Sequence, residues 1–142
     1  MTTDLRPERT NISVIEGKRM SIFYIIVSLI IPLSMFVLGA YYQKHPVENV
    51  NDIVGYRTAL SRKSPEAWAF AQKHWAKMWK LGGAILLPVS LITLYFLFGQ
   101  NEQKFDKEVL ILVGLQLLVM ILSVIPTEIA LRKNFDQQGR PK

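Results

Sequence analysis

The chain has 142 residues, no cysteine and a formal net charge of +6, and half of its residues are hydrophobic. This length suits one small domain or one small membrane bundle, and the lack of cysteine excludes disulfides and thiolate chemistry. The basic residues stand beside hydrophobic segments, and no nucleic-acid-binding motif is present. We therefore expect the charge to serve membrane orientation and contact with anionic membrane lipids, with no nucleic acid partner.

Three long segments carry no charged residue: residues 20–43, 81–101 and 109–127, which are 24, 21 and 19 positions long. A helix needs about 20 apolar residues to cross a hydrocarbon core of about 30 Å. The sequence therefore predicts an all-α integral membrane bundle of three transmembrane helices, at about residues 20–42, 81–98 and 109–131. The spans form a single membrane domain, residues 18–131, between polar tails at residues 1–17 and 132–142.

The amino-terminal tail contains the helix breakers Pro7 and Gly17, so we expect it to be loosely ordered. The first span has Pro32 near its centre. Proline removes one backbone hydrogen bond and crowds the preceding turn, which predicts a kink. Ser28 and Ser34 are the nearest candidates to satisfy the freed carbonyl groups.

The connection after the first span, residues 47–63, is the longest polar passage away from the termini. It ends at a strong helix start: Ser64 suits the N-cap, Pro65 the first helical position and Glu66 the positive first turn. The helix that follows carries an aromatic stripe with helical spacing, formed by Trp68, Ala71, Trp75, Met78, Trp79 and Gly82.

Three lysines lie on the face of this helix opposite the aromatic stripe. The pattern predicts one interfacial amphipathic helix over residues 65–80, which lies at the headgroup boundary or packs on the bundle there. Gly82 and Gly83 would form a bend into the second span. A charged loop at residues 99–107 leads to the third span, in which Gln116 is expected to join helices.

With three spans, the amino-terminal tail and the 99–107 loop share one side, which has six basic residues. The central connection and the carboxyl tail share the other side, which has eleven. Basic residues favour the cytoplasm, so the bias predicts a cytoplasmic carboxyl terminus and central connection, although Lys18 and Arg19 oppose it.

The central connection is the first place to expect a binding site. Free N–H groups at the amino end of a helix attract anions, a guanidinium can grip phosphate or carboxylate with two bonds, and hydroxyls add donors. The candidate ligand-binding residues in and beside this connection are Asn51, Gly55, Arg57, Thr58, Ser61 and Ser64. The structural alternative is that Ser64 caps the helix, the other hydroxyls bond the loop backbone, and Arg57 caps helix carbonyls.

Two further candidates lie outside the connection. Trp68 contacts a ligand in one interpretation and serves only as an interfacial aromatic in the other. Glu128 either forms an i, i+4 ion pair with Arg132 or closes the polar site by pairing with Arg57. The two histidines, His45 and His74, have no partners at metal-ligand spacing, so we expect no metal or other cofactor.

A recurrent loop pattern carries a family resemblance. The stretch GYRTALSRKSPEAWAFA contains Gly55, Tyr56, Arg57, Thr58, Ser61, Ser64, Trp68 and Ala71. Together with the ending PTEIALRKNFDQQGRPK, it resembles the SdpI family of bacterial membrane proteins over roughly residues 20 to 142. The best-known member is longer, and the chain is similar to its three-span carboxyl module. The resemblance implies a toxin-immunity-like protein of the bacterial cell membrane, with an antimicrobial peptide as partner.

Three classes of function remain to be compared. The first is a binding or immunity protein that takes a peptide or lipid at the polar connection. The second is a small-solute or lipid transporter, which gains little support because the spans hold mid-helix prolines but no charge pair. The third is a lipid enzyme, which we do not expect because no nucleophile motif or metal set is present. The sequence is also compatible with a homo-oligomer.

Overall fold

The computed structural model describes the backbone of residues 6–142, and it describes the side chains from Val14 onward together with Ile12. Over these residues it consists of four helices: α1 (Arg6–Lys44), α2 (Pro65–Leu97), α3 (Glu102–Leu122) and α4 (Val124–Asn134). No β-strand occurs in this part of the chain, which holds one isolated bridge between Phe135 and Pro141. The predicted all-α fold is confirmed.

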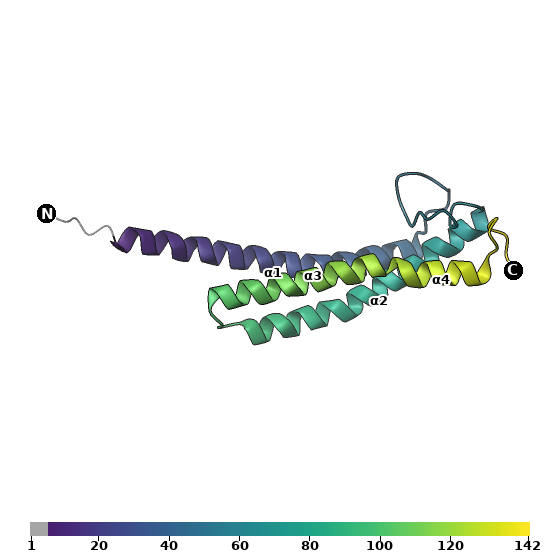
Figure 1. The fold of residues 1–142 in the computed structure, drawn as a ribbon. Coiled ribbons are helices and arrows are strands. Elements are labelled where there is room, and N and C mark those ends of the chain that lie inside the picture. The colour runs from purple at the N-terminus through teal and green to yellow at the C-terminus, as the bar shows by residue number, and fades with distance from the viewer. Residues whose placement is uncertain (1–5) are drawn as a thin grey trace.

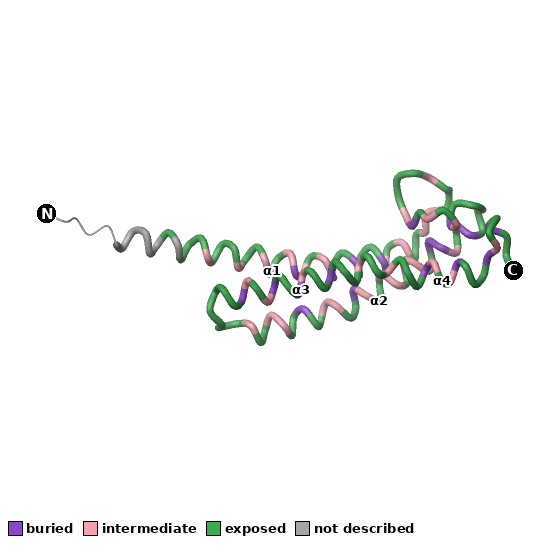
Figure 2. Tube along the Cα trace, in the orientation of Figure 1, coloured by how far each residue is buried: buried purple, intermediate pink, exposed green. Residues whose placement is uncertain are grey.

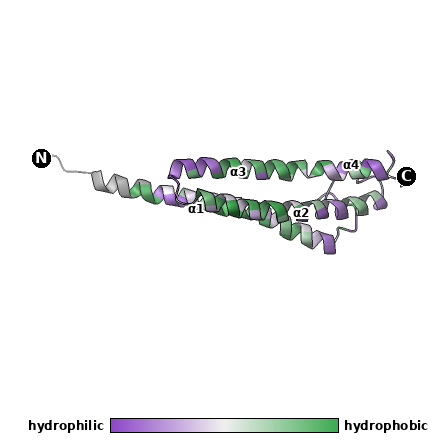
Figure 3. Cartoon of the chain, turned by 90° about the horizontal axis from the view of Figure 1, so that it is seen from below, coloured by the Kyte–Doolittle hydropathy of each residue, from purple (hydrophilic) through white to green (hydrophobic). Residues whose placement is uncertain are grey.

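The helices form an elongated bundle in which α1, α2 and the α3–α4 pair run side by side (Figure 1). Three helical segments are long and apolar enough to cross a membrane, Val14–Lys44, Pro65–Leu97 and Glu102–Asn134. Hydrophobic residues fill the middle of the bundle, and hydrophilic residues gather toward the end that holds the carboxyl terminus (Figure 3). The chain is therefore a membrane protein with three spans, as predicted.

Glycine allows α1 and α2 to approach closely. A Cβ atom on Gly83 would lie 2.6 Å from the carbonyl oxygen of Pro32 and 2.8 Å from Cα of Phe36. A Cβ atom on Gly39 would lie 2.8 Å from the carbonyl oxygen of Ala76. Since lipid tails are as apolar as the helices, small residues that permit close backbone contact drive helix association in membranes.

A polar cluster at mid-span joins all three transmembrane segments. Gln116 of α3 donates from Nε2 to the carbonyl oxygen of Ser28 in α1 at 2.9 Å and to Oγ of Ser90 in α2 at 2.7 Å. The Ser28 carbonyl is the one that Pro32 leaves without its helical donor, because proline has no N–H. Gln116 therefore joins helices as predicted, and it, rather than a serine, satisfies the carbonyl that Pro32 frees.

The first helix begins earlier than predicted. It starts at Arg6, so the described part of the amino-terminal tail is helical and not loosely ordered. Pro7 lies in the first turn, where its missing N–H leaves no hydrogen bond unmade. Gly17 costs only about 1 kcal/mol relative to alanine inside a helix, and a helix of 39 residues tolerates this. The first residues of α1 extend past the rest of the bundle (Figure 1).

The second helix is continuous from Pro65 to Leu97, so residues 65–80 do not form a separate interfacial helix and Gly82–Gly83 does not end one. The glycine pair meets α1 instead, which holds the helix together through the expected bend. The tryptophan stripe was predicted to lie at the headgroup boundary or to pack on the bundle. In the structure it packs on the bundle, because Trp68 and Ala71 are fully buried.

The third span is longer than predicted and is divided. It begins at Glu102, where the side chain of Asn101 caps the helix by accepting from the Lys104 N–H at 2.9 Å, so most of the expected 99–107 loop is helical. The helix is interrupted at Ser123. Pro126 explains this break, because a proline ring crowds the carbonyl four residues earlier, here that of Leu122.

Candidate functional site

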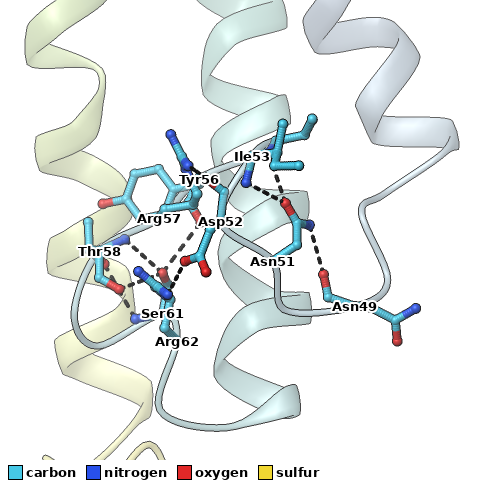
Figure 4. Close-up of polar contacts among 10 residues, drawn as sticks. Asn49, Asn51, Asp52, Ile53, Tyr56, Arg57, Thr58, Ser61 and Arg62 are labelled. Carbon is cyan, nitrogen blue, oxygen red and sulfur yellow. Dashed lines mark hydrogen bonds and ion pairs between the residues drawn. The ribbon is translucent and has the colours of Figure 1, made fainter.

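The connection between α1 and α2 folds over the end of the bundle beside the carboxyl terminus (Figure 1). Its first turn is built by Asn51, whose Oδ1 accepts from the N–H groups of Ile53 at 2.9 Å and Val54 at 2.8 Å. Its Nδ2 donates to the carbonyl of Asn49 at 3.0 Å. Asparagine side chains commonly form such local turns, so Asn51 shapes the loop (Figure 4).

The loop backbone is fixed to α2 at Tyr56. The N–H of Tyr56 donates to Oε1 of Gln72 at 2.8 Å, and Nε2 of Gln72 donates back to the Tyr56 carbonyl at 2.8 Å. Gly55 makes this contact possible, because its φ of 101° favours glycine and a Cβ atom there would collide with Oε1 of Gln72. The glutamine amide thus satisfies both backbone groups of Tyr56, as a neighbouring β-strand would do in a sheet.

Thr58 and Ser61 close the next turn on each other. Ser61 Oγ accepts from the Thr58 N–H at 2.9 Å and donates to the Thr58 carbonyl at 2.9 Å. Thr58 Oγ1 accepts from the Ser61 N–H at 3.3 Å. Ser61 is fully buried. These two hydroxyls therefore bond the loop backbone, which is the structural alternative to ligand binding (Figure 4).

Ser64 caps α2 as predicted, since its Oγ accepts from the Ala67 N–H at 3.0 Å. The same hydroxyl donates to the carbonyl of Gly139 in the carboxyl tail at 2.5 Å. The tail turns back through the bridge between Phe135 and Pro141 and reaches the start of α2. The amino end of α2 is therefore covered on one side by the tail.

Trp68 is fully buried, and its Nε1–H donates to the carbonyl of Val47 at 2.7 Å. Its ring is thus enclosed by protein, and its indole N–H is satisfied by the backbone. Trp68 therefore anchors the start of the connection, and a ligand contact by this ring stays a prediction. Beside it, a hydrophobic core joins the connection, α2, α4 and the tail, formed by Tyr56, Ala67, Ala71, Leu131 and Phe135. Buried residues gather at this end of the bundle and along the inner helix faces (Figure 2).

Arg57 is exposed, and its Nη1 donates to the backbone carbonyl of Asp52. The carboxylate of Asp52 pairs with Nη2 of Arg62. One aspartate thus contacts both arginines, through its backbone and its side chain (Figure 4). Arg57 caps a loop carbonyl rather than helix carbonyls, and its guanidinium stays at the surface of the loop.

Glu128 does not pair with Arg57. It forms the i, i+4 ion pair with Arg132, whose Nε lies 3.1 Å from Oε1. The hydroxyl of Tyr56 lies 3.3 Å from the other carboxylate oxygen and 3.2 Å from the Val124 carbonyl. Burial first, and the charge of Glu128 second, raise the pKa of Tyr56 to about 12. Arg57 is bonded to the Asp52 carbonyl instead, so the carboxylate of Glu128 does not close the loop site.

Three residues that hold the site were not among the predicted ones: Tyr56, Gln72 and Gly139. A signal existed for Gln72, because it follows Trp68 by four residues and shares its helix face. No local signal indicated the tail. Within the described residues, no group of three or more histidine, aspartate or glutamate side chains could hold a metal ion.

The site is therefore a loop whose hydroxyl and amide side chains bond the protein itself, and whose exposed charges are Asp52, Arg57, Arg62 and Lys63. No curated protein and no solved structure matches the chain significantly. The family model of the SdpI/YfhL protein family matches residues 49–127, which include the whole loop from Asn51, α2, α3 and the first residues of α4. This match covers more than half of the chain, and the chain accordingly belongs to the SdpI/YfhL protein family.

Proposed function

We propose that this membrane protein protects a bacterial cell against an antimicrobial peptide, by binding the peptide or a lipid at the loop between α1 and α2. The role is one of binding and not of catalysis. In this proposal the loop and the carboxyl terminus face the cytoplasm, in keeping with the excess of basic residues on that side.

One observation carries the proposal. Within the family motif Gly55–Tyr56–Arg57–Thr58, the neighbours of Arg57 are bonded to the protein, whereas the Arg57 side chain is exposed. Among the residues that the structure describes, its Nη1 alone is bonded, to the Asp52 carbonyl. A guanidinium has five N–H donors, so an edge stays available to grip a carboxylate or phosphate with two parallel bonds. A bonded loop that presents a guanidinium with no carboxylate partner among the described residues suits recognition of an anion.

The test replaces Arg57 with lysine, which keeps the charge but loses the planar fork. Cells that express each variant are challenged with a panel of membrane-active antimicrobial peptides, and the amount of protein in the membrane is measured in parallel. Wild type should protect, and Arg57→Lys should lose most of the protection at an unchanged protein level.

Arg62→Lys is the matched control. It lies in the same loop, and its exposed ion pair with Asp52 is of a kind that contributes only about 0–1 kcal/mol. It should therefore protect as wild type does. Full protection by Arg57→Lys would refute the anion-binding role of Arg57, as would failure of that variant to reach the membrane. Wild type that protects no better than an empty vector would refute the immunity function itself.

A further inference from the structure

A cleft of about 510 Å³ lies beside the loop, between its last turn, the end of α4 and the carboxyl tail. The residues that matter most in its lining are Leu60, Lys63, Glu128, Arg132, Phe135 and Lys142. Anion binding by Arg57 does not involve this cleft, because Arg57 does not line it. Its walls combine apolar side chains with charges of both signs.

The negative charges of the cleft are already paired. Glu128 pairs with Arg132 and accepts from the Tyr56 hydroxyl. Asp136, a further lining residue, pairs with Arg140 at 3.0 Å, and the Arg140 backbone N–H is the main cause that lowers the pKa of the Asp136 carboxyl. The cleft therefore keeps an excess of positive charge.

Three basic side chains line the cleft, and the carboxylate of Glu128 offsets one of them, Arg132. Lys63 is exposed, and Arg132 uses Nε for Glu128, so both of its Nη groups stay on the surface within the described part of the chain. Lys142 donates from Nζ to the carbonyl of Arg132, which brings its ammonium to the same place. Two ammonium groups and a guanidinium edge around one cleft suit a phosphate group.

Helix α4, which lines one side of the cleft, supplies an apolar path on its membrane side. Val124 and Ile125 precede Glu128 by four and three residues, and Arg132 follows it by four, so all of them share one face of α4. Val124 is 40% exposed and Ile125 is 51% exposed. Since residues 109–127 carry no charge, Glu128 stands at the boundary of the hydrocarbon core. These two exposed apolar side chains thus lie one helical turn from Glu128, on the membrane side of the cleft.

We propose that this cleft binds an anionic phospholipid, with its phosphate between Lys63, Arg132 and Lys142 and an acyl chain along Val124 and Ile125. The apolar floor, formed by Leu60 and Phe135, takes the glycerol region of the lipid. The site does not depend on the proposed immunity function, because Arg57 does not line it and other residues define it.

The test measures lipid binding by the purified full chain in detergent, with native mass spectrometry and short-chain phosphatidylglycerol as probe. Phosphatidylcholine of the same chain length and glycerol 3-phosphate, which has no chains, are the comparison ligands. The cleft variant is Lys63→Gln with Arg132→Gln. The control variant is Lys44→Gln with Lys133→Gln, two exposed lysines near the same end of the bundle that do not line the cleft.

Wild type should bind phosphatidylglycerol more tightly than either comparison ligand. The cleft variant should lose roughly tenfold or more in affinity, because each basic residue near a membrane surface contributes about 1 kcal/mol to attraction of anionic lipid. The control variant should lose less than about twofold, because it removes the same charge away from the site. Equal losses in both variants would reduce the effect to general surface charge and overturn the proposal.

Equal binding of glycerol 3-phosphate would also overturn it, since the apolar path would then have no role. Thermal unfolding of both variants in detergent is the control for folding. If the cleft variant is unfolded, Lys63→Gln alone gives the answer, because that side chain forms none of the ion pairs in the described structure. Unchanged phosphatidylglycerol affinity in Lys63→Gln would then contradict the site.

Discussion

Replacement of Gln72 with leucine tests how the loop is held. Gln72 is 1% exposed, and its amide bonds both backbone groups of Tyr56 at 2.8 Å. Leucine has a similar volume but cannot form either bond. The Tyr56 N–H would be buried without a partner, which costs about 1–3 kcal/mol, and loss of the second bond adds about 1 kcal/mol. The second loss is the smaller one because the Ser61 hydroxyl lies 3.4 Å from this carbonyl and shares its one hydrogen between it and the Thr58 carbonyl.

We therefore expect Gln72→Leu to lower the free energy of unfolding by about 2–4 kcal/mol. Thermal unfolding in detergent measures the global effect. Limited trypsin digestion measures the local one, because the loop contains Arg57 and Arg62 and a released loop is cut faster than a bonded one. The rate of cleavage in the loop should rise even below the temperature at which the helices unfold.

The matched control is Gln103→Leu, the same chemical change at an exposed position in the first turn of α3. A surface substitution of this kind changes stability by no more than about 0.5 kcal/mol. If Gln72→Leu unfolds and is cleaved as Gln103→Leu is, the amide does not hold the loop, and the reasoning that assigns Tyr56 and Gly55 to loop anchoring fails with it.

Three other predictions use the same protein. Ser64→Ala should cost about 1–2 kcal/mol, since it removes both the cap on Ala67 and the bond to Gly139, and unchanged thermal unfolding would contradict the cap. Burial and the nearby Glu128 charge raise the pKa of Tyr56 from 10.0 to about 12, so the folded state favours the neutral phenol. Its contribution to stability is complete below pH 10 and is lost as the pH rises toward about 12. Tyr56→Phe should lack this part of the alkaline destabilisation, and identical pH profiles would refute the assignment. Reporter tags at the carboxyl terminus and in the 57–63 loop should report the cytoplasm, and a tag between α2 and α3 the outside, while a carboxyl terminus accessible from outside intact cells would reverse the orientation.

The sequence by itself determined the features that depend on local order. The three spans follow from uninterrupted apolar length, which must match the thickness of the bilayer whatever the helices pack against. The start of α2 at Ser64 and Pro65 follows from capping chemistry, which needs only neighbouring residues. The ion pair between Glu128 and Arg132 follows from their spacing on one helix, and it was one of the two alternatives considered.

The boundaries of the helices were less predictable, because packing decides whether a weak breaker ends a helix. Gly17 predicts a helix break and the Gly82–Gly83 pair a bend, yet α1 and α2 continue through them. At Gly83 the reason is tertiary: the missing side chain admits the backbone of α1, and this contact stabilises the helix that the glycine would weaken.

Only the tertiary structure decided what the loop residues do. A serine or tryptophan in a polar stretch has the same appearance whether it binds a ligand or the protein, and its partner is chosen by segments distant in sequence. Gln72 meets Tyr56 from 16 positions away, Gly139 meets Ser64 from 75, and Gln116 meets the carbonyl that Pro32 frees from 88 residues along the chain. Buried polar groups must find partners, and the fold determines which ones are within reach.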